Sequence, residues 1–234
     1  MKKVYVAVAA AMMIAGSATA QVKFGLEAGW NFNNLADKYE GETNSNMFKH
    51  GFHAGVVSDI GLSDHFSIAP GLRYSMKGGE VDREYNEQWE GKSTAVKNKH
   101  KLTYHYVELP VNVVYKTGVE GSGRFMIGAG PYLAYMVNAQ EKWNLSRIWI
   151  EDGQGLGNSD KGARQLGIGD DEGDEIKALD YGAQAFVGYQ LANGVFFKGG
   201  SQFGFANTLP KGSSTFYQKN YNFFVTVGYM FGGR

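Results

Sequence analysis

Apolar and polar residues alternate along the chain from Val22 onward. In the stretch VKFGLEAGWNFN every second residue, starting from the valine, is apolar, and the residues between are lysine, glycine, glutamate or asparagine. A period of two is typical of a β-strand with one apolar and one polar face. Such an apolar face can line a soluble core or meet lipid, and the rest of the chain decides between these alternatives.

The same pattern recurs in seven later segments, so the sequence predicts eight strands. They cover about residues 22–33, 50–60, 65–77, 102–116, 124–138, 178–191, 194–206 and 220–231. Soluble proteins usually have strands of about five or six residues. Most of these segments are longer and could cross a bilayer at a tilt.

The connections between the predicted strands alternate in length. GLSD, TGVEGSG and ANG are short and have the composition of tight turns, whereas residues 34–49, 78–99, 139–177 and 207–219 form long polar connections. This alternation predicts an all-β fold, an eight-stranded antiparallel up-and-down transmembrane β-barrel with short periplasmic turns and long extracellular loops. Both termini are then expected on the periplasmic side.

The distribution of residues between the two faces indicates that the apolar face meets lipid. The polar face is mostly glycine, which suits the narrow lumen of an eight-stranded barrel and would make a poor soluble surface. On the apolar face, aromatic residues gather at both strand ends around an aliphatic band, as in the aromatic girdles of outer-membrane barrels. The girdle residues predicted here include Phe24, Trp30, Tyr74, Tyr115, Tyr135, Tyr181, Tyr189, Tyr221, Tyr229 and Phe231.

Three prolines interrupt this pattern. Pro70, Pro110 and Pro131 lie inside predicted strands. Because proline cannot donate a ladder hydrogen bond and a closed barrel has no free edge, we expect bulges or ladder gaps at these positions.

The first 20 residues have the features of a secretory signal peptide. Lys2 and Lys3 precede an apolar stretch that ends in Ala18-Thr19-Ala20. A transmembrane anchor is the alternative, although the stretch is short for one. We expect residues 1–20 to be a cleaved signal peptide and residues 21–234 to form one domain in the outer membrane of a Gram-negative bacterium.

Composition narrows the range of functions. Cysteine is absent, so neither disulfides nor thiol chemistry is available. Basic and acidic residues balance at 23 each, so nothing in the charge suggests a nucleic-acid partner.

Five motifs in order carry a family resemblance over the whole mature chain. They are GLEAGWN, APGLRYSMKGG, YVELPVNVVYK, GAGPYLAY and VGYMF. With these motifs the chain resembles the PorT-like outer-membrane β-barrel proteins of Gram-negative bacteria. The resemblance implies an eight-stranded barrel with a polar or filled interior, but no single activity.

No catalytic, cofactor or metal site is expected. The histidines at positions 50, 53, 65, 100 and 105 do not converge on one face. The acidic run GDDEGDE (169–175) could offer oxygen ligands to calcium, but its spacing favours a solvated loop. No nucleophile motif is present, so an enzyme is not expected.

Charged residues on the polar face predict the state of the lumen. Arg73 and Glu108 fall at the same height on adjacent strands, and Glu27 and Lys198 point inward somewhat lower. We expect an Arg73–Glu108 ion pair within a network that fills the lumen, because isolated charges are poorly hydrated there. Trapped water at each charge is the alternative.

The favoured function is a monomeric structural or interaction protein. It would contact outer-membrane lipid with the barrel and a protein or glycan with its extracellular loops. A small pore or solute-binding barrel, and a barrel enzyme acting on lipid or peptide, are the alternatives.

Overall fold

The computed structural model describes residues 22–39, 42–44, 48–89, 92–119, 122–151, 154–171, 173–210, 212–213 and 216–232. The predicted signal peptide, residues 1–20, lies outside these ranges. The described chain forms one antiparallel sheet, which confirms the expected all-β class. Its strands are β1 (Val22–Tyr39), β2 (Glu42–Asn44), β3 (Lys49–Gly61), β4 (Phe66–Trp89), β5 (Lys92–Lys116), β6 (Arg124–Glu151), β7 (Gln154–Gln165), β8 (Leu179–Gln190), β9 (Val195–Gly204) and β10 (Tyr217–Met230).

Eight of these strands close into a ring. Each pairs with the next in the order β1, β3, β4, β5, β6, β8, β9 and β10, and β10 pairs back with β1 from Gly25↔Met230 to Lys38↔Tyr217. The eight predicted segments each fall on one of these strands. Within the described ranges, no helical segment has the length and apolar character needed to cross a membrane.

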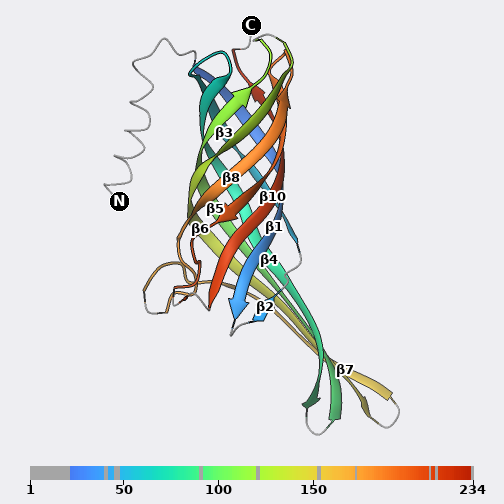
Figure 1. The fold of residues 1–234 in the computed structure, drawn as a ribbon. Helices are drawn as coiled ribbons and strands as arrows, with labels where there is room; N and C mark the ends of the chain where they lie inside the picture. Colours follow the sequence, from blue (N-terminus) through green and yellow to red (C-terminus); the bar gives the residue numbers. More distant parts are fainter. Residues whose placement is uncertain are drawn as a thin grey trace.

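The two ends of the ring differ in how far the strands extend beyond it, as Figure 1 shows. The start of β1 and the end of β10 lie at one end, which we call the turn end because short connections join the strands there. Beyond the other end, β4, β5 and β6 continue and are joined by β7 in a narrow sheet that extends far from the ring. We call its paired residues 79–89, 92–102, 140–151 and 154–165 the projecting sheet.

The projecting sheet corrects the expectation of polar loops at residues 78–99 and 139–177. β4 and β5 remain paired up to Trp89↔Lys92, and β6 folds back on β7 up to Glu151↔Gln154. Part of the connection 34–49 is also strand, since β1 runs to Tyr39 and pairs with β2. Ladder hydrogen bonds need no apolar face, so strands continue where apolar alternation stops.

Local irregularities mark the level at which the sheet leaves the ring. Gly78 in β4 has a φ of +122°, a conformation that side-chain-bearing residues rarely adopt. In the β5–β6 pair, the register shifts between His105 and Tyr106. Bulges of this kind bend strands and increase their twist.

The three strand prolines coincide with ladder gaps, as expected. The β3–β4 ladder is interrupted beside Pro70, the β4–β5 ladder beside Pro110 and the β5–β6 ladder beside Pro131. Each ladder resumes in its former register, so these are gaps and not bulges. On the β3 side, the Ser58 hydroxyl donates to the Pro70 carbonyl (3.1 Å).

Apolar side chains inside the ring form two clusters separated along its axis. The turn-end cluster contains Ala69, Val114, Met126, Phe186, Phe196, Phe224 and Met230. The projecting-end cluster contains Leu35, Tyr104, Tyr106, Tyr132, Ala134, Met136, Ala139 and Ile176. Ile176, from the connection between β7 and β8, packs among the strand residues and so helps to close that end.

Candidate functional site

The outer face of the ring is apolar and exposed. Phe24, Trp30, Tyr115, Tyr135, Tyr181, Tyr229 and Phe231 are exposed, and Tyr74, Tyr189 and Tyr221 are half-buried. Neighbouring aromatic side chains contact one another near both ends of the strands. Examples are the pairs Phe125–Tyr189 and Tyr221–Phe223, whose ring centroids lie 4.9 and 5.0 Å apart. Leu26, Ile127 and Val187 between these ends are more than half exposed. A continuous apolar surface of this extent needs an apolar solvent.

The centre of the ring holds buried charges in direct contact. Arg73 Nε donates to Glu108 Oε2 (2.7 Å), and the two residues are also register partners in β4 and β5. Lys77 Nζ lies 2.6 Å from Glu108 Oε1 and 3.6 Å from Asp180 Oδ2. All four side chains are at least 96% buried, so Glu108 is shared between two cations away from water.

A second pair extends this group toward the turn end. Lys198 Nζ donates to Glu27 Oε2 (2.6 Å), and Arg73 Nη1 lies 3.9 Å from Glu27 Oε1. The remaining donor capacity of Arg73 reaches Gln184 Oε1 (2.9 Å), and Gln184 donates in turn to Asn112 Oδ1 (2.9 Å). We call the six charged residues Glu27, Arg73, Lys77, Glu108, Asp180 and Lys198 the lumen network.

Aromatic rings flank the cations of the lumen network. Lys77 Nζ lies 4.4 Å from the ring centroid of Tyr132, and Lys198 Nζ lies 5.1 Å from that of Phe186. The inward glycines make room for such rings: a Cβ on Gly128 would lie 2.3 Å from Cζ of Phe186. Cation–π contacts and ion pairs therefore hold the same ammonium groups.

The histidines do not gather around one point. His53 is buried in the lumen, with its ring nitrogens 2.8 Å from Asn31 Oδ1 and 3.0 Å from Thr226 Oγ1. His105 contacts Tyr74 on the outer face, and His100 lies on the projecting sheet beside Glu141. Among the described residues, no group of three or more histidine or acidic side chains is placed to hold a metal ion.

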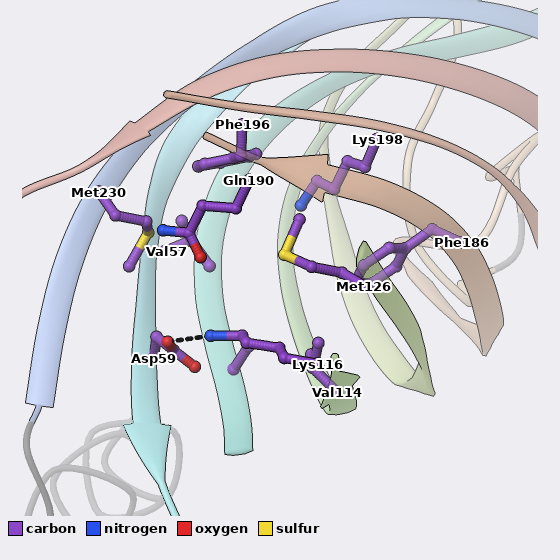
Figure 2. A pocket seen from close by; sticks show the side chains of 11 residues that line it. Val57, Asp59, Val114, Lys116, Met126, Phe186, Gln190, Phe196, Lys198 and Met230 are labelled. Carbon is purple, nitrogen blue, oxygen red and sulfur yellow. Dashed lines mark hydrogen bonds and ion pairs between the residues drawn. The ribbon is translucent and has the colours of Figure 1, made fainter. Parts of the chain in front are cut away.

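A cavity with about 40 Å³ of free space lies below the lumen network at the turn end. Figure 2 shows Met126, Phe186, Phe196 and Met230 around it, with Lys198 at its inner end. Asp59 and Lys116, which pair with each other, line the side nearer the turns. The cavity is therefore mainly apolar, and each of its two lysines is paired with a carboxylate.

The two faces of the projecting sheet differ in chemistry. One carries a ladder of ion pairs between acidic residues of β4 and lysines of β5, such as Lys97–Glu84 (2.7 Å) and Lys99–Glu80 (3.2 Å). By alternation, Trp143 and Trp149 of β6 lie on the opposite face, together with the exposed side chains of Tyr85 and Leu156.

Glu141 joins the base of the projecting sheet to its surroundings. It lies 3.0 Å from His100 Nδ1 and accepts from Arg164 Nε (2.8 Å), and Arg164 also reaches Glu175 Oε1 (2.7 Å). Partial burial raises the pKa of the Glu141 carboxyl, but the hydrogen bonds from His100 and Arg164 outweigh this effect and hold the pKa below its usual value. In the acidic run, Asp174 accepts from the backbone N–H of Asp171 (2.9 Å).

Comparison with models of protein families identifies the family of this chain. The model of the outer membrane protein beta-barrel domain family matches residues 15–209, which is most of the chain. The chain belongs to this family. Membership supports an outer-membrane location and agrees with the closed ring and its apolar outer face.

Similar solved structures come from other outer-membrane proteins, and comparison with curated proteins finds no match. Ail of Yersinia pestis, in complex with the heparin analogue sucrose octasulfate, is 8% identical with a TM-score of 0.40, covering 90% of this chain and 99% of Ail. Neisserial surface protein A is 9% identical with a TM-score of 0.39, covering 89% and 98%. OprG of Pseudomonas aeruginosa is 9% identical with a TM-score of 0.31, covering 91% and 97%.

The structure brings the four predicted lumen residues together and adds others. Lys77 makes two ion-pair contacts in the network, as Glu27 does, and Asp180 makes one. Gln184 of β8 is linked to the network by its hydrogen bond from Arg73. Lys77 could have been found from its sequence, because it is four residues from Arg73 and therefore shares its face. Asp180 could not, since its height relative to Lys77 depends on the register across β5, β6 and β8.

Removing one charged side chain of the lumen network should lower the free energy of unfolding, because its partners then remain buried without a counter-charge. For Glu108→Ala we expect a loss of about 3–5 kcal/mol in the free energy of unfolding, because Arg73 and Lys77 lose their shared carboxylate. Urea unfolding of the protein in lipid vesicles measures this loss. Glu84→Ala, which removes an exposed partner of Lys97, is the matched control and should leave the unfolding midpoint unchanged.

A double variant tests whether charge balance is the cause. Arg73→Met with Glu108→Leu leaves the Lys77–Asp180 and Lys198–Glu27 pairs intact. It should destabilise less than Glu108→Ala alone. Equal midpoints for Glu108→Ala and Glu84→Ala would contradict the ion-pair account.

Proposed function

We propose that this protein is an integral outer-membrane barrel that acts as an interaction protein through its projecting sheet. The observation that carries the proposal is the continuation of three ring strands, β4, β5 and β6, well beyond the closed ring, where β7 joins them (Figure 1). The ring provides a rigid anchor, and the sheet displays residues at a distance from the membrane surface. The role is non-catalytic, because the buried charges pair with one another and not with a space open to substrate.

The proposed orientation places the projecting sheet outside the cell. In outer-membrane barrels with an even number of strands, short turns and both termini face the periplasm and the longer connections face outward. Here the short turns lie at the end of the ring opposite the projecting sheet. We also propose that residues 1–20 are a cleaved signal peptide and that one chain forms a complete, monomeric barrel, since β1 and β10 close the ring within it.

The lumen is proposed to be closed to solutes. The network lies across the ring, linking β1 and β9 through Glu27–Lys198 and β4 and β5 through Arg73–Glu108. Apolar clusters lie above and below it. An ion would have to separate paired charges that are buried in the lumen, which is costly.

The open edges of the projecting sheet favour a protein partner. Among the described strands, β7 pairs only with β6, and β4 pairs only with β5 beyond Ser75. Unpaired backbone N–H and C=O groups along such edges can accept a strand from another chain. The exposed Tyr85 and Leu156 add apolar contact area. A glycan partner at the same surface remains the alternative.

We propose, on the five sequence motifs, that the closest functional grouping within the family is that of the PorT-like proteins. No secretion role is transferred with it. The grouping adds an expectation of a filled barrel, which agrees with the lumen network.

Cysteine labelling tests the orientation, because the chain contains no cysteine of its own. A membrane-impermeant maleimide should label Ser159→Cys, in exposed β7, on intact cells. Val119→Cys, in the exposed turn between β5 and β6, should react only after the outer membrane is permeabilised. The opposite pattern would reverse the orientation.

Planar-bilayer recording tests closure of the lumen. The native protein should show no steady open-channel current, and Glu108→Ala should open more often because two cations lose their counter-charge. A steady current in the native protein that Glu108→Ala leaves unchanged would show that the network blocks nothing.

Photo-crosslinking tests the interaction surface. A photoreactive phenylalanine analogue replacing Leu156 on living cells should give a discrete protein adduct. The same analogue replacing Val227, on the outer face of the ring, is the matched control and should give none. Absence of protein adducts at Leu156, Tyr85 and Trp149 alike would argue against a protein partner.

A further inference from the structure

The cavity at the turn end is separate from the projecting sheet and from the interior of the lumen network. Its position follows from the residues that line it: Lys116 ends β5, Met126 is close to the start of β6 and Met230 ends β10. Its inner end is Lys198, which the network holds through Glu27. It is therefore a blind recess that opens at the turn end.

We propose that this cavity binds a small neutral molecule with an apolar body and one hydrogen-bond donor. The proposal goes beyond the interaction role of the projecting sheet, and it assigns a second site at the opposite end of the molecule. Its free space of about 40 Å³ admits about three water molecules, so a ligand ring enters where the flexible side chains of Met126 and Met230 make room for it.

The walls suit an apolar body. Met126, Phe186, Phe196 and Met230 are each less than 10% exposed and pack as one cluster, with Val57 against it. Methionine side chains are flexible and polarisable, so they adapt to ligands of different shape and make favourable contacts with aromatic rings. Met126 of β6 and Met230 of β10 therefore allow the cavity walls to close around a flat aromatic ligand.

The carboxylate of Asp59 is the reason to expect a hydrogen-bond donor on the ligand. Asp59 lines the cavity and pairs through one carboxylate oxygen with Lys116. Its other oxygen, Oδ1, is buried without a hydrogen-bond partner among the described residues. Because a buried acceptor without a partner is unfavourable, a ligand that donates to Oδ1 gains a hydrogen bond that the empty site lacks.

Charge balance favours a neutral ligand. Lys116 is matched by Asp59 and Lys198 by Glu27. An anionic ligand would compete with these carboxylates for their lysines, and a cationic ligand would compete with the lysines for the carboxylates. A neutral donor disturbs neither pair.

Methyl NMR of the full chain in lipid nanodiscs tests the proposal, with indole as the probe. Indole is neutral, flat and apolar and carries one N–H donor. In protein with ¹³C-methyl methionine, the signals of Met126 and Met230 should shift and saturate as indole is added. Met136 in the projecting-end cluster and Met76 on the outer face should not follow them.

Two comparisons make the test specific. 1-Methylindole keeps the ring but lacks the donor, and it should bind about three- to tenfold more weakly. Ala69→Leu fills the cavity from a lining position and should weaken indole binding at least tenfold, whereas Ala28→Leu, on the exposed outer face, should not. The first comparison uses native protein, so it stands even if Ala69→Leu does not fold.

Several outcomes would overturn the proposal. One is that Met126 and Met230 do not shift at millimolar indole, and another is that Met76 shifts in step with them, which indicates partition into lipid. Equal binding of indole and 1-methylindole would refute the role of Asp59. Equal titrations of Ala69→Leu and Ala28→Leu would place the ligand elsewhere.

Discussion

The need to cancel charge inside a narrow ring governs this structure. Three acidic and three basic side chains lie in the lumen network, and each contacts at least one opposite charge. A single unmatched charge in that space would be costly, because little water can reach it. The network is therefore sensitive to register: a slip of one residue between β4 and β5 would turn Arg73 or Glu108 toward the apolar outer face.

Space inside the ring is divided in layers around this charged centre. Small residues opposite large rings allow the aromatic side chains to reach the axis, as Gly128 does opposite Phe186 and Gly228 opposite Phe196. The rings cover the cations from the side, and the two apolar clusters separate the charges from both ends. The cavity lies at the turn end, where the side chains of the turn-end cluster do not fill the interior of the ring.

The projecting sheet obeys the same rules in a different solvent. Inside the membrane, the outer face must be apolar, and the lumen face carries the charges. Beyond the ring, ion pairs such as Lys99–Glu80 occupy the face that continues the apolar outer side of the ring. The backbone ladder is continuous across this change, which makes the sheet a rigid extension of the barrel wall.

Alternation along single strands determined much of this molecule from sequence alone. Because a period of two assigns each residue to a face, it identified the eight ring strands, their apolar outer side and the inward direction of Glu27, Arg73, Glu108 and Lys198. Proline chemistry likewise predicted the gaps at Pro70, Pro110 and Pro131. The same reasoning treated residues 78–99 and 139–177 as loops, because charged strands in water lack the apolar period on which it relied.

Only the tertiary structure decided which inward residues meet. The contact of Lys77 with Asp180 depends on registers that accumulate over four strands, including a bulge in the β5–β6 pair. The packing of the aromatic rings in the lumen depends on register as well: alternation places Phe186 and Phe196 on the inward face, but their meeting with Phe224 and Met230 follows only from closure of the ring. Face is a local property of a strand, whereas height and partner across the lumen exist only once the ring has closed.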